Sequence, residues 1–277
     1  MNSSYRERRL AEGYPDLSKL AHEKFSAMIE KRKDDLERIE NLLEYLNRLI
    51  DVSCGKKILV LGCGPKPQAI RILLQKNYDV VGVEPVSLHV QSANEYLGSQ
   101  NAVLEGAAEQ IPLLDASQDL IFFDSVLEHV DSPDQAIKEI FRVLRPGGIV
   151  YITTTNRYKF SLTGGNGEFD VPFYNWLPRL VKECIVFHQL HYKPGLAGYT
   201  ERPAVHWWSY SDLCDLGRRS GFAKFYSILD LVRPDDPNIR KSALRRFLLP
   251  KLQCSPWLRA LALTQLSGEI IMFKRLD

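Results

Sequence analysis

Two glycines and a glutamate in the first half of the chain have the types and spacing of a ligand-binding turn. Gly62 and Gly64 interrupt one apolar run, and Glu84 ends a second apolar run about 20 residues later. Glycine lets main chain approach a ligand closely because it has no Cβ. A carboxylate at that distance can accept hydrogen bonds from both hydroxyls of a ribose. The pattern predicts a site for a cofactor that contains a nucleoside.

The order of apolar runs indicates the elements that position these residues. Strands are expected at 57–61, 79–84, 102–105, 119–124, 148–154, 222–231 and 268–274, and helices at 67–76, 88–97, 134–144 and 211–220. Strands that alternate with helices form a mostly parallel, doubly wound sheet, whose ligands bind outside the carboxyl ends of the strands. The expected fold class is therefore α/β, with Glu84 at the binding edge.

Composition is that of a globular protein, with 45% hydrophobic and 25% charged residues among 277. The net charge of +2 gives no reason to expect nucleic acid as a partner. The five cysteines have no C-x-x-C spacing, which favours a reducing compartment. The N-terminal residues have no apolar segment typical of a secretory signal, and no stretch reaches the roughly 18 uncharged apolar residues of a membrane span. We expect a cytoplasmic protein.

The chain is expected to have four parts. These are an N-terminal helical extension (1–50), a cofactor-binding core (51–156), an inserted lid for the substrate (157–208), and a C-terminal part that completes the sheet and carries a basic segment (209–277). Three- and four-residue steps predict one apolar helical face in the extension: Leu36, Ile39, Leu43, Leu46 and Ile50. This helix is expected to cover the sheet, since the pattern is short for a dimerising coiled coil. A long aromatic-rich insertion after a central strand is expected over the binding crevice.

Three further motifs follow the glycine turn in a fixed order. They are GAAEQIP at 106–112, DLIFFDSVLEHV at 119–130 and FRVLRPGG at 141–148. The ordered set resembles the class I S-adenosylmethionine-dependent methyltransferases, in the small-molecule branch that includes the ubiquinone-biosynthesis methyltransferases. The resemblance is close over about 56–156 and looser over 209–222 and the final strand. It implies a Rossmann-like, seven-stranded sheet with an antiparallel last strand, S-adenosyl-L-methionine as the cofactor, and methyl transfer as the reaction.

The resemblance also assigns the cofactor site residue by residue. Gly62 and Gly64 would approach the methionine part and Glu84 the ribose, Ala108 and Glu109 would lie along the adenine, Asp124 and Ser125 would line the floor, and Cys63 and Pro85 would complete the contacts. Three positions depart from the family pattern: Val60 and Ala107 stand where acids are common, and Lys66 stands where glycine is common. Each lost contact would cost about 1–3 kcal/mol if its partner is left unsatisfied. A non-catalytic relative that binds the cofactor therefore stays open.

His129 is the leading candidate for a general base. Methyl transfer depends mainly on alignment, and a base is needed only when the acceptor is a hydroxyl that is not already ionised. The alternative is that Glu128 and His129 only stabilise the loop there. His188 and His191 have metal-like spacing but no third ligand nearby, so no metal site is expected. Small-RNA 2′-O-methyltransferases carry a second glutamate where this chain has Ser125, which disfavours that class.

The acceptor is expected to be a small or lipid-linked molecule that is methylated at oxygen. The lid aromatics would wall an apolar or planar group. The basic, partly apolar stretches 178–192 and 239–266 are each either a solvated helix face or a peripheral membrane contact. An NAD-dependent oxidoreductase on the same glycine turn is the rival class, disfavoured because Lys66 and Pro67 follow where the third glycine would stand. The sequence does not indicate an oligomeric state.

Overall fold

Continuous apolar runs form the central strands, as expected where a sheet is covered on both faces. The parallel strands are β1 (Lys57–Leu61), β2 (Asp79–Glu84), β3 (Val103–Glu105), β4 (Gln118–Asp124) and β5 (Leu144–Thr154). β6 (Lys224–Tyr226) and β7 (Gly268–Phe273) complete a seven-stranded sheet of order β3-β2-β1-β4-β5-β7-β6, in which β7 runs antiparallel to β5 and β6. The predicted doubly wound α/β sheet with an antiparallel last strand is confirmed.

The computed structural model describes residues 35–159, 173, 176–178, 180–181, 204, 206–265 and 268–276. Residues 1–34 of the predicted extension and most of the predicted lid, including His188, His191 and the stretch 182–192, lie outside the described residues. No helix in the described part of the chain is both long and apolar enough to span a bilayer.

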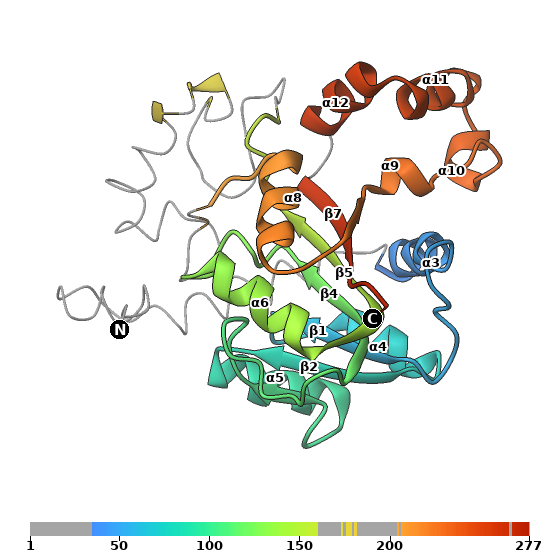
Figure 1. The fold of residues 1–277 in the computed structure, drawn as a ribbon. Helices are drawn as coiled ribbons and strands as arrows, with labels where there is room; N and C mark the ends of the chain where they lie inside the picture. Colours follow the sequence, from blue (N-terminus) through green and yellow to red (C-terminus); the bar gives the residue numbers. More distant parts are fainter. Residues whose placement is uncertain are drawn as a thin grey trace.

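Helices cover both faces of the sheet (Figure 1). On one face lie α3 (Asp35–Leu46), α4 (Gln68–Gln75) and α5 (Ser87–Leu97), which share an apolar cluster with β1, β2 and β4. On the other lie α6 (Pro133–Val143) and α8 (Tyr210–Arg219), packed on the opposite sides of the same strands. Four further helices stand between β6 and β7: α9 (Ile228–Leu231), α10 (Pro237–Arg240), α11 (Ala243–Cys254) and α12 (Pro256–Gln265).

Two expectations about individual elements are wrong. The predicted strand 222–231 is only three residues long, because Ser227 starts α9 and its backbone N–H donates to the Asp230 carboxylate at 2.7 Å. This pairing is a capping box, which fixes the first turn of a helix and so ends the strand. In α3, Ile39, Leu43 and Leu46 are buried as predicted, but Leu36 is 52% exposed and does not belong to the packed face.

Candidate functional site

The carboxyl ends of β2, β1, β4 and β5 lie next to one another at one edge of the sheet. Glu84 ends β2, the glycine turn follows β1, and Asp124 ends β4. Neighbouring strand order therefore brings together three groups of predicted site residues that are far apart in the sequence. This is the edge at which doubly wound sheets bind their ligands.

The glycine turn has a backbone conformation that other residues rarely adopt. Gly62 has φ +66° and Gly64 has φ +68°. A Cβ on Gly62 would lie well inside van der Waals contact with the side chain of Val126, which belongs to the turn after β4. Glycine at position 62 is therefore required both by the backbone angle and by the close approach of the two turns.

Glu84 holds the glycine turn directly. Its carboxylate is 5% exposed, and Oε2 accepts a hydrogen bond from the Gly64 N–H at 3.0 Å. Oε1 accepts from the Val86 N–H at 3.3 Å and lies 3.2 Å from Nδ1 of His89. A carboxylate has about four acceptor positions, so these contacts leave capacity for a ligand hydroxyl. The 20-residue spacing of Gly64 and Glu84 in the sequence therefore corresponds to a direct hydrogen bond.

Cys63 and Pro85 flank this contact. Cys63 packs partly against the core below the turn. Burial raises the pKa of its thiol well above the usual value, and the charge of Glu84 raises it further. A raised thiol pKa disfavours the nucleophilic thiolate form of Cys63. Pro85 is half-buried and follows Glu84 directly.

The residues predicted to lie along the adenine have structural contacts of their own. Ala108 is 8% exposed and packs in the core. Oε1 of Glu109 accepts hydrogen bonds from the N–H groups of Asp131 at 2.8 Å and Ser132 at 3.2 Å. A carboxylate at this position stabilises the N-terminal end of α6. The loop after β3 is also fixed to β2, because the Gly106 N–H donates to the Glu84 carbonyl at 3.1 Å.

Asp124 and Ser125 lie in a polar cluster at the end of β4. The Thr153 hydroxyl donates to Oδ1 of Asp124, and Nη2 of Arg38 in α3 lies 2.5 Å from Oδ2. Ser125 has φ +57°, and its N–H donates to the Thr153 carbonyl at 3.0 Å. The contact between Arg38 and Asp124 could not be predicted from the sequence, because it joins residues on separate elements.

A second carboxylate, Glu269, belongs to the same cluster and was not predicted. It is opposite Thr153 in the register of β5 and β7, and the Tyr151 hydroxyl donates to its Oε2 at 3.3 Å. Burial raises the pKa of Glu269 to about 7; the Tyr151 hydrogen bond lowers it, and the charge of Asp124 raises it. The candidate site therefore contains an acid that titrates near neutral pH.

Replacing Glu269 by glutamine is expected to stabilise the fold at alkaline pH. The folded pKa lies near 7, above the unfolded value near 4.3, so the native state binds the extra proton between these values. Stability from this group is therefore complete at low pH and is lost as pH rises through about 7. Glutamine does not ionise, so the unfolding free energy of the variant lacks this loss. As pH rises from 5 to 8, the unfolding free energy of Glu269→Gln should therefore increase by about 1–3 kcal/mol relative to that of the parent. Urea unfolding at several pH values measures this.

The matched control for this prediction is Glu37→Gln, which changes an exposed carboxylate on α3. It should leave the pH dependence of unfolding unchanged. A Glu269→Gln variant whose stability difference from the parent is the same at pH 5 and pH 8 would contradict the raised pKa.

The Glu128–His129 pair lies at the same edge. Glu128 is 4% exposed and accepts from the Thr154 hydroxyl at 2.8 Å, while its carbonyl accepts from the His206 N–H at 3.3 Å. Nε2 of His206 donates to the Val130 carbonyl at 2.9 Å, and burial lowers the pKa of His206. These contacts give Glu128 a structural role. His129 is half-buried beside them.

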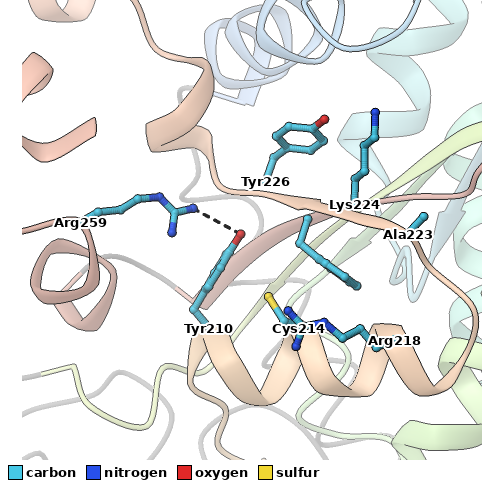
Figure 2. A pocket seen from close by; sticks show the side chains of 8 residues that line it. Tyr210, Cys214, Arg218, Ala223, Lys224, Tyr226 and Arg259 are labelled. Carbon is cyan, nitrogen blue, oxygen red and sulfur yellow. Dashed lines mark hydrogen bonds between the residues drawn. The ribbon is translucent and has the colours of Figure 1, made fainter. Parts of the chain in front are cut away.

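A pocket between α8, β6 and α12 contains none of the predicted site residues (Figure 2). Arg259 of α12 lies at its edge, with its guanidinium 3.5 Å from the Tyr210 hydroxyl. Burial raises the pKa of Tyr210 to about 12, so its hydroxyl stays protonated. The contact joins α12 to α8. Among the described residues, no cluster of His, Cys, Asp and Glu could hold a metal ion.

Comparisons with known proteins agree with this geometry. Residues 59–152 match the model of a methyltransferase domain. A Mycolicibacterium smegmatis protein named "Probable S-adenosylmethionine-dependent methyltransferase" is 32% identical over 41% of this chain and 44% of its own length. A ubiquinone biosynthesis O-methyltransferase of Aliivibrio fischeri is 31% identical over 46% and 56%, respectively. The plantazolicin methyltransferase BamL, solved with S-adenosylhomocysteine, is 15% identical over 98% of this chain and 95% of its own, with a TM-score of 0.57.

The class of domain follows from the sheet, the glycine turn and these matches. Residues 59–152 form a methyltransferase domain of the S-adenosylmethionine-dependent kind, on the Rossmann-like methyltransferase fold. The chain spans about half the length of the curated relatives it matches. The predicted class and its cofactor, S-adenosyl-L-methionine, are confirmed at this level.

Proposed function

We propose that the chain transfers the methyl group of S-adenosylmethionine to an oxygen atom of a small or lipid-linked acceptor. The observation that carries this proposal is the buried Glu84 carboxylate, hydrogen-bonded to the Gly64 N–H at 3.0 Å at the carboxyl edge of the sheet. A carboxylate in this position can accept hydrogen bonds from ribose hydroxyls, and the neighbouring glycines have no Cβ to keep a ligand away from the main chain, which supports the proposal.

The residues of the edge fit the cofactor. In this proposal Gly62 and Gly64, which have positive φ angles and no Cβ, face the methionine part, and Cys63 and Pro85 lie beside the turn. Ala108, Glu109, Asp124 and Ser125 are proposed to contact the rest of the cofactor. The bound cofactor would supply an electrophilic methyl group on sulfur. The chain's own residues would align the acceptor oxygen with it and exclude water, and alignment can account for roughly 7–11 kcal/mol of a barrier.

Transfer to oxygen is favoured by the relatives named as ubiquinone biosynthesis O-methyltransferases. The half-buried His129 at the same edge is the proposed base, which takes the proton of a hydroxyl acceptor as the oxygen–methyl bond forms. The lid, residues 157–208, is proposed to wall the acceptor.

Calorimetry with S-adenosylmethionine, S-adenosylhomocysteine and NAD tests the cofactor. Binding of the first two without NAD supports the proposal, whereas binding of NAD alone would identify an oxidoreductase instead. Incubation with methyl-labelled cofactor and either a metabolite or a lipid extract then tests transfer. Label in an O-methyl product supports the proposal, label on nitrogen or carbon corrects the acceptor atom, and absence of label from both extracts indicates a binding protein.

Replacing His129 by asparagine is expected to slow methylation of weakly acidic hydroxyls by about 10²-fold or more, with the affinity for S-adenosylhomocysteine unchanged. The loss should shrink for acceptors that are already ionised, because these need no base. A series of phenols of graded hydroxyl pKa separates this role from a structural one: an equal loss across the series would show that His129 only supports the loop.

A further inference from the structure

Two consecutive helices near the C-terminus expose large apolar side chains. On α11, Leu244 is 65% exposed, Phe247 61% and Leu248 40%, and their spacing places them on one helical face. On α12, Trp257 is 76% exposed and Leu261 is 52% exposed, again four residues apart. The two helices contact each other. We call these five residues the C-terminal apolar patch.

The inner sides of the same helices carry polar contacts as well as apolar ones. Nε2 of Gln253 donates to the carbonyls of Leu229 and Val232, both at 2.8 Å. Arg259 points inward to Asp230 at 2.7 Å, and Figure 2 shows it turned toward Tyr210. A helix on a water-exposed surface normally has its charged residues outside and its apolar residues inside. These two helices show the reverse in part, because Arg259 forms an ion pair on the inner side while Trp257 and Phe247 are exposed.

The patch lies in a stretch of sequence that is rich in positive charge. Between Asp236 and Glu269 the sequence contains six cations and no acid: Arg240, Lys241, Arg245, Arg246, Lys251 and Arg259. Among the described residues, only Arg259 of these six pairs with a carboxylate. Nζ of Lys251 lies 3.7 Å from the centre of the Phe247 ring, so charge and apolar surface adjoin. The complementary partner is negatively charged and offers an apolar layer beneath its charge.

One end of α12 lies at the edge of the sheet that carries the candidate site. Nδ2 of Asn156, just past the carboxyl end of β5, donates to the carbonyls of Leu263 at 2.9 Å and Thr264 at 3.3 Å. The last turn of α12 is thereby fixed at the edge that carries the cofactor residues. Figure 1 shows α11 and α12 beyond the sheet, joined to it through β7.

We infer that α11 and α12 bind the surface of a bilayer that contains anionic lipids. Tryptophan, phenylalanine and leucine enter the headgroup region, while the lysines and arginines contact lipid phosphates; this is the composition of helices that lie in a membrane interface. A membrane is favoured over a protein partner because the same short helices carry both positive charge and exposed apolar side chains. An anionic bilayer offers negative charge at its surface and an apolar layer directly beneath it. Only the further step, that a lipid-linked acceptor reaches the site from the membrane, rests on the proposed function.

Vesicle binding tests the inference without cofactor or acceptor, so its failure would leave the proposed methyl transfer standing. The full chain is sedimented with vesicles of phosphatidylcholine alone and of phosphatidylcholine with phosphatidylglycerol. Binding is expected only to the second kind and should weaken with salt. In the unmodified chain, brominated lipid should quench part of the tryptophan fluorescence, which requires no variant to fold.

Two sets of variants separate the contributions. Phe247→Ser with Trp257→Ser should lower the partition coefficient by about tenfold or more, because two large apolar side chains no longer enter the interface. Arg245→Gln with Arg246→Gln should lower it by roughly fivefold per charge. The matched control is Leu114→Ser, which removes a side chain that is 81% exposed elsewhere on the surface and should change nothing.

Three outcomes would overturn the inference. These are no binding to either vesicle, equal binding to both kinds, and binding that the patch variants leave unchanged. A concentration-dependent dimer that Trp257→Ser abolishes, without vesicle binding, would show that a second copy of the chain covers the patch instead.

Discussion

Replacing Glu84 by alanine is expected to weaken the binding of S-adenosylhomocysteine at least tenfold. The carboxylate has two functions in the proposed site: it accepts hydrogen bonds from the ribose, and it holds the Gly64 N–H at 3.0 Å. A hydrogen bond to a charged group is worth about 1.5–3 kcal/mol, and a single one corresponds to roughly a tenfold change in affinity or more. Isothermal calorimetry with the parent and the variant measures the change.

The control for this variant is Glu105→Ala, on the neighbouring strand β3. Glu105 ends β3 opposite Glu84 in the register, but it is exposed and bonds to the Ser87 hydroxyl at 2.8 Å. Glu105→Ala should leave the affinity within about twofold of the parent, within the small effects typical of exposed pairs. Glu84→Gln keeps the side-chain volume and one acceptor oxygen. Its affinity for S-adenosylhomocysteine should therefore lie between those of Glu84→Ala and Glu105→Ala. An unchanged affinity in Glu84→Ala would remove Glu84 from the ribose role.

The sequence predicted those parts of the site that depend on neighbours along the chain. Apolar runs defined β1 and β2, and two glycines marked the turn between β1 and α4. The position of Glu84 at the end of β2 was then sufficient to place it opposite the turn, because adjacent parallel strands end at the same edge. The hydrogen bond between Gly64 and Glu84 explains why these two residues are 20 positions apart in the sequence.

Contacts across the sheet could not be predicted in the same way. The Tyr151–Glu269 hydrogen bond joins β5 to β7, and it exists because these strands pair in one register and not in another. A shift of one residue would turn Glu269 to the other face of the sheet. The Arg38–Asp124 pair further depends on how α3 lies across the sheet. Periodicity in α3 showed which side is buried, but not which strand it meets.

Two other residues show that a polar side chain in a motif can stabilise the fold instead of binding a ligand. Glu109 was assigned by resemblance to the adenine, and its Oε1 is occupied by two N–H groups at the start of α6. Glu128 is buried and bonded to Thr154. Both carboxylates satisfy local backbone or hydroxyl donors, which a linear sequence does not display.

Replacing Gly62 by alanine is expected to destabilise the fold by about 2–5 kcal/mol and to weaken cofactor binding with it. Two costs combine. The left-handed backbone angle, φ +66°, costs a residue with a Cβ about 1–2 kcal/mol. The added carbon also overlaps the side chain of Val126, and overpacking of this kind costs about 1–3 kcal/mol. Thermal unfolding and calorimetry with S-adenosylhomocysteine measure both effects.

Two further variants separate these costs. Gly98 has φ +64° and nothing within 4 Å of the position of an added Cβ, so Gly98→Ala should show the backbone cost alone. In a Val126→Ala background the two methyl groups that overlap an added Cβ are absent, so Gly62→Ala should lose less stability there than in the parent, a coupling that a double-mutant cycle reports. Equal losses for Gly62→Ala and Gly98→Ala would mean that the two turns have room to separate. That result would contradict the close packing of the turn after β1 on the turn after β4, beside the proposed cofactor site.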